Sequence, residues 1–160
     1  MKNRMNWRDY TMIQVDTEDL CSTEIVCGIW INHGFSKAER ALHRLLNSIH
    51  LIRCVAFCGI GEISFQIEKI VQNIKVIHPY LRVAIIGNAQ WYNHMPCLTQ
   101  NKLLRLLDEA DFFIPCPFPI EDALVFLSYC SDYLIVDNCE PFFDYVDSIN
   151  EKRKIKVYRL

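Results

Sequence analysis

The sequence lacks the features that mark several classes of protein. It has eight cysteines but no Cys-x-x-Cys pair, so we expect neither a structural zinc site nor a disulfide framework. No run approaches about 20 uncharged apolar residues, which predicts no transmembrane helix and no membrane partner. The first residues contain no long apolar run, so we expect no secretory signal. Together these absences predict a protein of the reducing cytoplasm.

Basic charge is also scarce. The chain carries 17 Lys and Arg against 19 Asp and Glu, a net charge of −2, and the sequence shows no basic stripe. Nucleic-acid binding needs clustered cations that neutralise phosphates, so we expect no nucleic-acid partner.

Glycine is rare, and its placement is informative. Of five glycines in 160 residues, four directly follow or closely follow apolar runs. There is no Gly-x-Gly-x-x-Gly and no Gly-x-x-x-x-Gly-Lys, so neither common phosphate-binding signature is complete. A glycine turn after a strand can bring backbone amides close to a ligand, but a tight strand-to-helix turn also needs glycine without any ligand. Both interpretations stay open.

Apolar, strand-like runs alternate with helical patterns along most of the chain. Runs at 24–31, 52–57, 81–86, 111–114 and 132–137 are nearly continuous in apolar residues, as strands buried on both faces are. Between them, apolar residues recur at helical spacing, and Ser36 and Glu39 have the spacing of a capping box for the first helix. This alternation predicts an α/β, Rossmann-like, doubly wound and mainly parallel sheet with helices on both faces.

The two ends of the chain differ from the middle. Residues 1–22 are polar and mixed, and we expect an N-terminal arm or edge segment there, in which Trp7, Tyr10, Met12, Ile13 and Val15 could pack. Residues 23–160 are expected to form a single domain, because no linker, repeat or low-complexity tract interrupts them. At the C-terminal end, KIKVYR alternates as a half-exposed edge strand would.

In such sheets ligands bind beyond the carboxyl ends of the strands. Gly59 and Gly61 would present turn amides to a phosphate or ribose, Glu62 would accept ribose hydroxyls, and Trp91 would stack on a base. Glu62 as a helix-end acid and Trp91 as a packed loop residue are the alternatives. The predicted ligand-binding residues are Asn32, His33, Gly59, Gly61, Glu62, Gly87 and Trp91. We expect no metal ion and no resident cofactor.

The order of elements resembles one family. The stretch CVAFCGIGEISFQIEKIVQNIKVIHPYLRVAIIG, followed by Gln90-Trp91, LLDEADFF and FLSYCSDYLIVDN, is similar to the YpsA-like branch of the SLOG superfamily. The likeness spans about residues 24–160 and implies a Rossmann-like fold that binds a nucleotide-derived small molecule. Two family turns differ: Asn32-His33-Gly34 replaces a Thr-Gly-His-Arg-Pro-like motif, and Asn138-Cys139-Glu140-Pro141 replaces a Gly-Gly-Thr-like turn.

These observations predict a sensor or regulatory module that binds a nucleotide-derived small ligand. The altered turns favour an alternative, a non-catalytic relative that acts as a protein-interaction module in cell division or envelope regulation. A nucleotide N-glycosidase-type hydrolase that uses Glu62 is a third hypothesis. The sequence leaves enzymatic activity undecided, leaning towards none, and leaves a homo-oligomer open.

Overall fold

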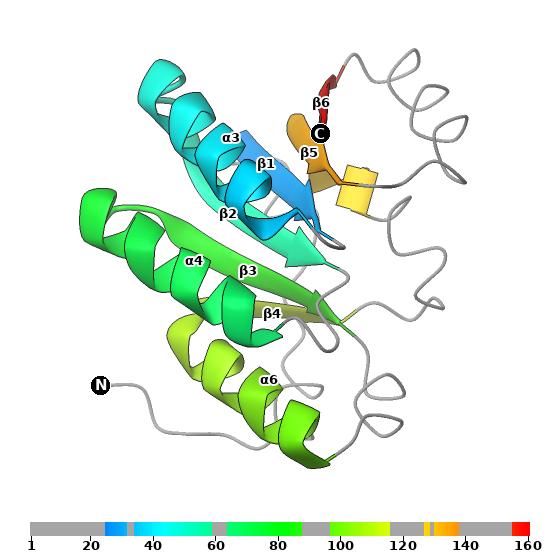
Figure 1. Ribbon diagram of the computed structural model, residues 1–160. Coiled ribbons are helices and arrows are strands. Elements are labelled where there is room, and N and C mark those ends of the chain that lie inside the picture. The colour runs from blue at the N-terminus through cyan, green and yellow to red at the C-terminus, as the bar shows by residue number, and fades with distance from the viewer. Residues whose placement is uncertain are drawn as a thin grey trace.

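The computed structural model describes residues 25–31, 34–58, 64–87, 97–115, 127–128, 130–137 and 155–160. Within these residues, six strands form one sheet in the order β4-β3-β2-β1-β5-β6, and every neighbouring pair is parallel (Figure 1). The strands are β1 (Ile25–Trp30), β2 (Ile52–Cys58), β3 (Arg82–Gly87), β4 (Phe112–Pro115), β5 (Tyr133–Val136) and β6 (Lys156–Arg159). This confirms the predicted α/β, Rossmann-like fold. The predicted N-terminal arm lies outside the described residues.

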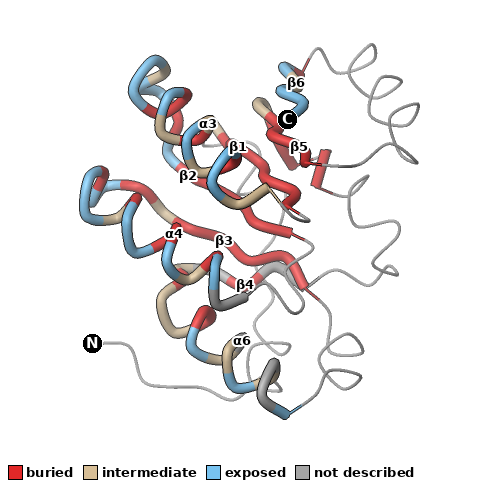
Figure 2. Tube along the Cα trace, viewed as in Figure 1, coloured by how far each residue is buried: buried red, intermediate tan, exposed pale blue. Residues whose placement is uncertain are grey.

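Three helices lie side by side across one face of the sheet (Figure 1). They are α3 (Phe35–Ser48), α4 (Ser64–Ile77) and α6 (Cys97–Glu109). Strands β1, β2, β3 and β4 follow one another in the same direction across the sheet. Because each connection between them is a right-handed crossover, the connecting helices α3, α4 and α6 lie on the same face. In Figure 2 strands β1, β2, β3 and β5 are mostly buried, β6 is largely exposed, and the outer sides of the helices are exposed, as their apolar stripes predict.

The core lies between these helices and the facing side chains of the sheet. Its largest buried side chains include Phe57 and Phe113 from the strands and Leu42, Ile67 and Ile74 from the helices. These residues alternate with others that face the opposite side, so each central strand is buried on both faces. This double burial explains why the strands appear in the sequence as continuous apolar runs.

On the second face of the sheet, opposite these three helices, small residues line the strands where Leu127 and Ser131 approach them. Gly28 pairs in register with Ala56, and Ala56 pairs with Ala84, which places a row of small residues across β1, β2 and β3. A β-carbon on Gly28 would collide with the Ser131 hydroxyl and touch Leu127. The helical residues 127–128 and 130 therefore pack closely on this face, opposite α3, α4 and α6. Helices thus lie on both faces, as predicted.

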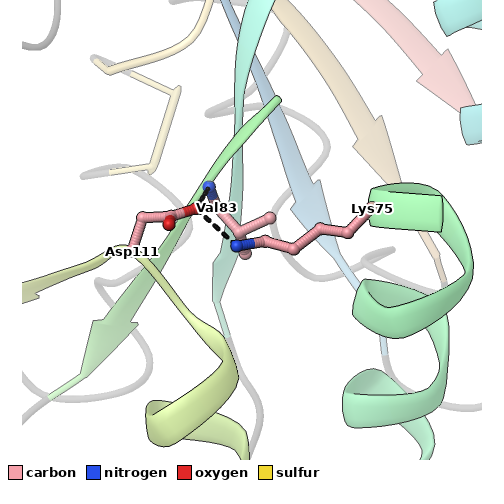
Figure 3. Close-up of polar contacts among 3 residues, drawn as sticks. All are labelled: Lys75, Val83 and Asp111. Atoms are coloured by element: carbon pink, nitrogen blue, oxygen red, sulfur yellow. Dashed lines mark hydrogen bonds and ion pairs between the residues drawn. The ribbon is translucent and has the colours of Figure 1, made fainter. Parts of the chain in front are cut away.

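Two aspartates anchor strands at the amino edge of the sheet. The Asp111 carboxylate accepts a hydrogen bond from the Val83 amide at 2.8 Å and from Lys75 Nζ at 2.8 Å (Figure 3), and the Asp111 amide donates to the Val83 carbonyl. Asp132 repeats the arrangement with Val26, whose amide donates to the Asp132 carboxylate at 2.9 Å. Each aspartate directly precedes its strand, so it fixes the start of that strand against its neighbour.

The predicted capping box is wrong. Helix α3 begins at Phe35 with Gly34 as its N-cap, so Ser36 lies inside the first turn, and no side chain of the cap residue caps the helix. Glu39 instead accepts a hydrogen bond from Asn73 of α4 at 2.8 Å and lies 3.6 Å from His43 Nε2. The spacing of Ser36 and Glu39 fits a capping box. The acceptor at the start of α3 is instead the carboxylate of Asp137, which follows β5.

Candidate functional site

The strand order reverses between β1 and β5. From β1 the chain adds β2, β3 and β4 on one side, then returns to add β5 and β6 on the other side. In open parallel sheets, ligands bind outside the carboxyl ends of the strands at such a reversal of strand order. In this protein the reversal lies beside Trp30, at the end of β1, and Asp137, which directly follows β5.

Asp137 joins the two sides of this switch point. Its backbone amide donates to the Trp30 carbonyl at 2.9 Å, which extends the pairing of β5 with β1 by one residue. Its carboxylate accepts a hydrogen bond from the Gly34 amide at 2.7 Å. The residue is only 7% exposed. Asp137 thus caps helix α3 with a side chain that comes 103 positions later in the sequence.

The Asp137 carboxylate determines whether a negatively charged ligand group can bind at the start of α3. The N-terminus of a helix carries free amides and about half a positive charge, which makes it attractive to phosphates. At α3 a buried carboxylate already holds that position, and its negative charge repels a second anion. The first turns of α3 and α4 contain no acidic residue of their own. The Asp137 carboxylate therefore makes the start of α3 unfavourable for a ligand phosphate.

Trp30, at the switch point, has an indole N–H that makes no hydrogen bond to a described residue. The residue is 6% exposed, and its Nε1 is buried without an acceptor among the described residues. Ile29 and Ile31, its neighbours, belong to the core under α3, so the alternation of a strand directs Trp30 to the second face. Buried indole N–H groups are usually hydrogen-bonded, so this one is a candidate contact for a bound molecule.

Of the predicted ligand-binding residues, the structure describes Gly87 alone. It is buried, ends β3 and pairs in register with Pro115 of β4, two strands away from β1. The carboxyl-edge position predicted for Gly87 agrees with this. The other predicted residues lie outside the described part of the chain: Asn32, His33, Gly59, Gly61, Glu62 and Trp91.

Four of the five described cysteines are buried. Cys27, Cys54, Cys58 and Cys130 lie in the sheet or against it, as small core residues, and Cys97 is exposed at the start of α6. Burial in apolar surroundings raises the pKa of the Cys27 thiol far above its usual range, and nearby Cys54 adds to the effect. A thiol with a raised pKa stays protonated and unreactive at neutral pH. Within the described residues, no group of three or more His, Cys, Asp or Glu is arranged to hold a metal ion.

Asp137 and Trp30 were not predicted as ligand-binding residues, although the position of each in an apolar run was visible. Asp137 ends the run DYLIVD, so its position after a strand was visible, but its contact with Gly34 depends on the pairing of β5 with β1. Trp30 occurs in the apolar run EIVCGIWI and has the composition of a core residue. Its unpaired nitrogen becomes apparent only once its neighbours are in place.

Comparisons with known proteins do not assign the chain to a family. No protein-family model matches it, and no curated protein matches it significantly. Among the helices that the structure describes, none has both the length and the apolar character needed to cross a membrane. What is established is an α/β fold with a parallel, Rossmann-like sheet and a switch point between β1 and β5.

Proposed function

We propose that this protein is a divergent member of the YpsA-like branch of the SLOG superfamily and binds a nucleotide-derived small ligand as a sensor or regulatory module. The observation that supports this most strongly is the switch point between β1 and β5, because ligands of open parallel sheets bind there. The resemblance of residues 24–160 to that family supports the same fold and the same edge.

The charge at α3 refines where the ligand would lie. Asp137 occupies the start of α3, and we assign the phosphate end of the ligand to the sequence Gly59-Ile60-Gly61, which precedes α4. The nucleoside end then extends towards the switch point, where Trp30 Nε1 can donate a hydrogen bond. In this arrangement Glu62 would accept ribose hydroxyls and Trp91 would stack on the base.

The first experiment is thermal unfolding of the purified protein with a panel of nucleotides and nucleotide derivatives. A ligand that binds only the native state at about 100 times its dissociation constant stabilises it by about 2.7 kcal/mol, which shifts the Tm by several degrees. We expect one class of compound to give such a shift. No shift across a concentrated panel would contradict the proposal.

Variants locate the site once a compound binds. Gly61→Val should abolish the shift without lowering the Tm of the free protein, since it blocks the approach to the turn amides. Trp30→Phe removes one N–H and should weaken binding about fivefold, which corresponds to a loss of about 1 kcal/mol of binding free energy. Tyr80→Ala, at the opposite edge of the sheet, is the matched control and should bind normally. Full binding by Gly61→Val would show that the ligand lies elsewhere.

Loss of the compound over time, prevented by Glu62→Gln, would indicate hydrolysis.

The opposite edge of the sheet supports the second candidate, a protein-interaction module. Four large apolar side chains are exposed there, in the last turn of α4 and in the turns after α3 and α4: Leu51 (69%), Val76 (82%), Ile77 (58%) and Tyr80 (45%). Exposed apolar side chains that gather on one side of a protein mark interaction surfaces. If this surface pairs two copies, sedimentation velocity will show a concentration-dependent dimer that Leu51→Asp with Ile77→Asp abolishes. A monomer at all concentrations would exclude self-association through this surface.

A further inference from the structure

Helix α3 and strand β6 border a groove on the face of the sheet that carries α3, α4 and α6. One end has a volume of about 540 Å³ and is lined by Lys37, Arg40, His43, Arg44, Asn47 and Leu160. The adjoining end, of about 600 Å³, shares Arg44 and Leu160 and continues along both elements to Ile49 and Val157. Four Lys and Arg residues line the two ends, and none of the described Asp and Glu residues does.

Three of these cations form a basic stripe along α3. Lys37, Arg40 and Arg44 are spaced by three and four residues, so they lie on one side of the helix. All three are exposed, and none of them forms an ion pair with a described acidic residue. The expectation of no basic stripe is therefore wrong at this helix. Like charges this close repel one another, so a negatively charged partner would stabilise them.

The floor of the groove is apolar. Tyr158 of β6 pairs in register with the core residue Ile135, so its side chain lies on the same face of the sheet as α3. Tyr158 and Leu160 are each 38% exposed, whereas Ile135 on the neighbouring strand is buried. On the helix side of the groove, Ala41 is half-buried beside the stripe. The groove thus has a basic rim over an apolar floor that is still accessible to a partner.

The groove lies at the next position in the layer of helices. Helices α6, α4 and α3 lie side by side on this face, and the described helices end with α3 while the sheet continues through β5 to β6 (Figure 1). Two strand spacings are about 10 Å, which is also the distance at which one helix packs beside another. Helix α3 has 14 residues and is about 21 Å long. The space beside it therefore has the width and length of one more helix.

Charge and shape together favour one kind of occupant. The stripe from Lys37 to Arg44 covers only about 10 Å of helix axis, whereas nucleic-acid binding commonly neutralises about six to ten phosphates. A flat membrane surface does not reach the floor of a groove. An amphipathic helix fits both parts, because such helices place apolar side chains at i, i+3, i+4 and i+7 into a groove and leave their flanks free for acidic residues. We propose that the groove between α3 and β6 binds an acidic amphipathic helix of a partner protein. This binding is separate from the proposed ligand site and does not depend on it.

Fluorescence anisotropy with a labelled synthetic peptide tests the proposal. The probe has the 14-residue length of α3, with Leu at helical spacing on one side, Glu on both flanks and no Lys or Arg. We expect saturable binding to the wild-type protein that weakens as NaCl is added, because salt screens exposed charges. A scrambled peptide of the same composition keeps the charge but lacks the apolar side, and it should bind at least about tenfold more weakly. No saturable binding of the probe would overturn the proposal, and so would equal binding of the scrambled peptide.

Charge reversal locates the binding surface. Arg40→Glu with Arg44→Glu should weaken binding of the probe by about tenfold or more, since two attractions become repulsions. The same variant should bind a probe with Lys in place of Glu more tightly than the wild type does. Arg53→Glu with Lys69→Glu changes the net charge equally at exposed positions outside the groove, and this matched control should bind normally. Unchanged binding after the reversal at Arg40 and Arg44 would overturn the proposal.

Two further measurements distinguish other occupants. Tyr158→Ser removes the aromatic ring from the floor and should weaken binding severalfold, and full binding by this variant would show that the probe does not enter the groove. A single-stranded oligonucleotide of the same charge that binds more tightly than the probe would overturn the proposal, because the groove would then recognise phosphates. A concentration-dependent dimer in sedimentation velocity that the reversal at Arg40 and Arg44 abolishes would also overturn it, since a second copy would be the occupant.

Discussion

At the scale of single residues, aspartates that precede strands hold this sheet together. Asp111 and Asp132 each accept the amide of a residue in the neighbouring strand and return their own amide to its carbonyl. In the sequence both stand at the first position of an apolar run, at 111–114 and 132–137. Their hydrogen-bond partners, 28 and 106 positions away, follow only from the strand order.

Asp111→Ala should lower the free energy of unfolding by about 2 kcal/mol, because a hydrogen bond to a charged group is lost and the Val83 amide is left without that acceptor. Lys75→Met removes only the half-exposed cation of the same cluster and should cost less than about 1 kcal/mol. Urea unfolding of both variants measures the difference. Equal losses would mean that the ion pair, not the backbone contact, gives Asp111 its stabilising effect.

Gly28 shows how a small residue serves packing on the second face. A β-carbon there would collide with the Ser131 hydroxyl, which donates to the Leu127 carbonyl at 2.7 Å, and would press on the Leu127 side chain. We expect Gly28→Ala to lower the free energy of unfolding by about 1–3 kcal/mol. Ser131→Ala should relieve part of that loss, so the double variant should be more stable than the sum of the two single changes. Simple additivity would contradict the predicted collision.

At the scale of elements, helix α3 depends on a residue outside itself. Gly34 has an ordinary φ of −86°, so the turn needs no left-handed residue. A β-carbon there would lie 3.0 Å from Asp137 Oδ1, a tight contact, so the close approach of that carboxylate favours glycine. For the glycine turns, the sequence left open either a close approach to a ligand or a tight turn without one, and at Gly34 the group that comes near is the protein's own side chain.

Removing this cap tests the dependence. Asp137→Ala should lower the free energy of unfolding by about 1–2 kcal/mol, as the loss of an N-cap acceptor does, and should speed hydrogen exchange at the first turn of α3. Asp137→Asn keeps an acceptor and should lose less. If both variants are as stable as the wild type, the bond between Gly34 and Asp137 makes no net contribution to α3.

At the scale of the whole molecule, stability should depend on a histidine buried at the end of α4. His78 is 8% exposed, and its ring meets Tyr80 edge-on with centroids 5.9 Å apart. Burial lowers the pKa of His78 below 6.5, and the nearby His43 and His50 lower it further. The folded protein therefore keeps His78 neutral at a pH at which the unfolded chain already binds a proton.

The sign of the pH effect follows from this difference. Above pH 6.5 both states are neutral at His78 and stability is unaffected. As the pH falls below 6.5 the unfolded state gains the proton first, so the free energy of unfolding decreases by up to about 1.4 kcal/mol per pH unit until the folded state also titrates. Unfolding in urea between pH 7.5 and 5 should show this decrease and His78→Phe should flatten it, whereas His50→Gln, which removes only a minor cause of the lowered pKa, should weaken it in part. An unchanged slope in His78→Phe would assign the decrease to other groups.

The sequence by itself determined the class of fold, the alternation of strands and helices, and the identity of the edge strand β6. These follow from local patterns: residues buried on both faces are continuously apolar, helices repeat every 3.6 residues, and a half-exposed strand alternates. Such patterns depend only on which residues must be removed from water.

Only the tertiary structure decided which distant groups meet. The strand order placed Asp137 on the start of α3, left the Trp30 nitrogen beside the switch point and set the basic stripe of α3 against β6. The physical reason is that hydrogen bonds and charge pairs act over a few ångströms in space, whatever their separation in the chain. The place of the switch point, and hence the geometry of the candidate site, was fixed when β5 paired with β1 and not beside β4.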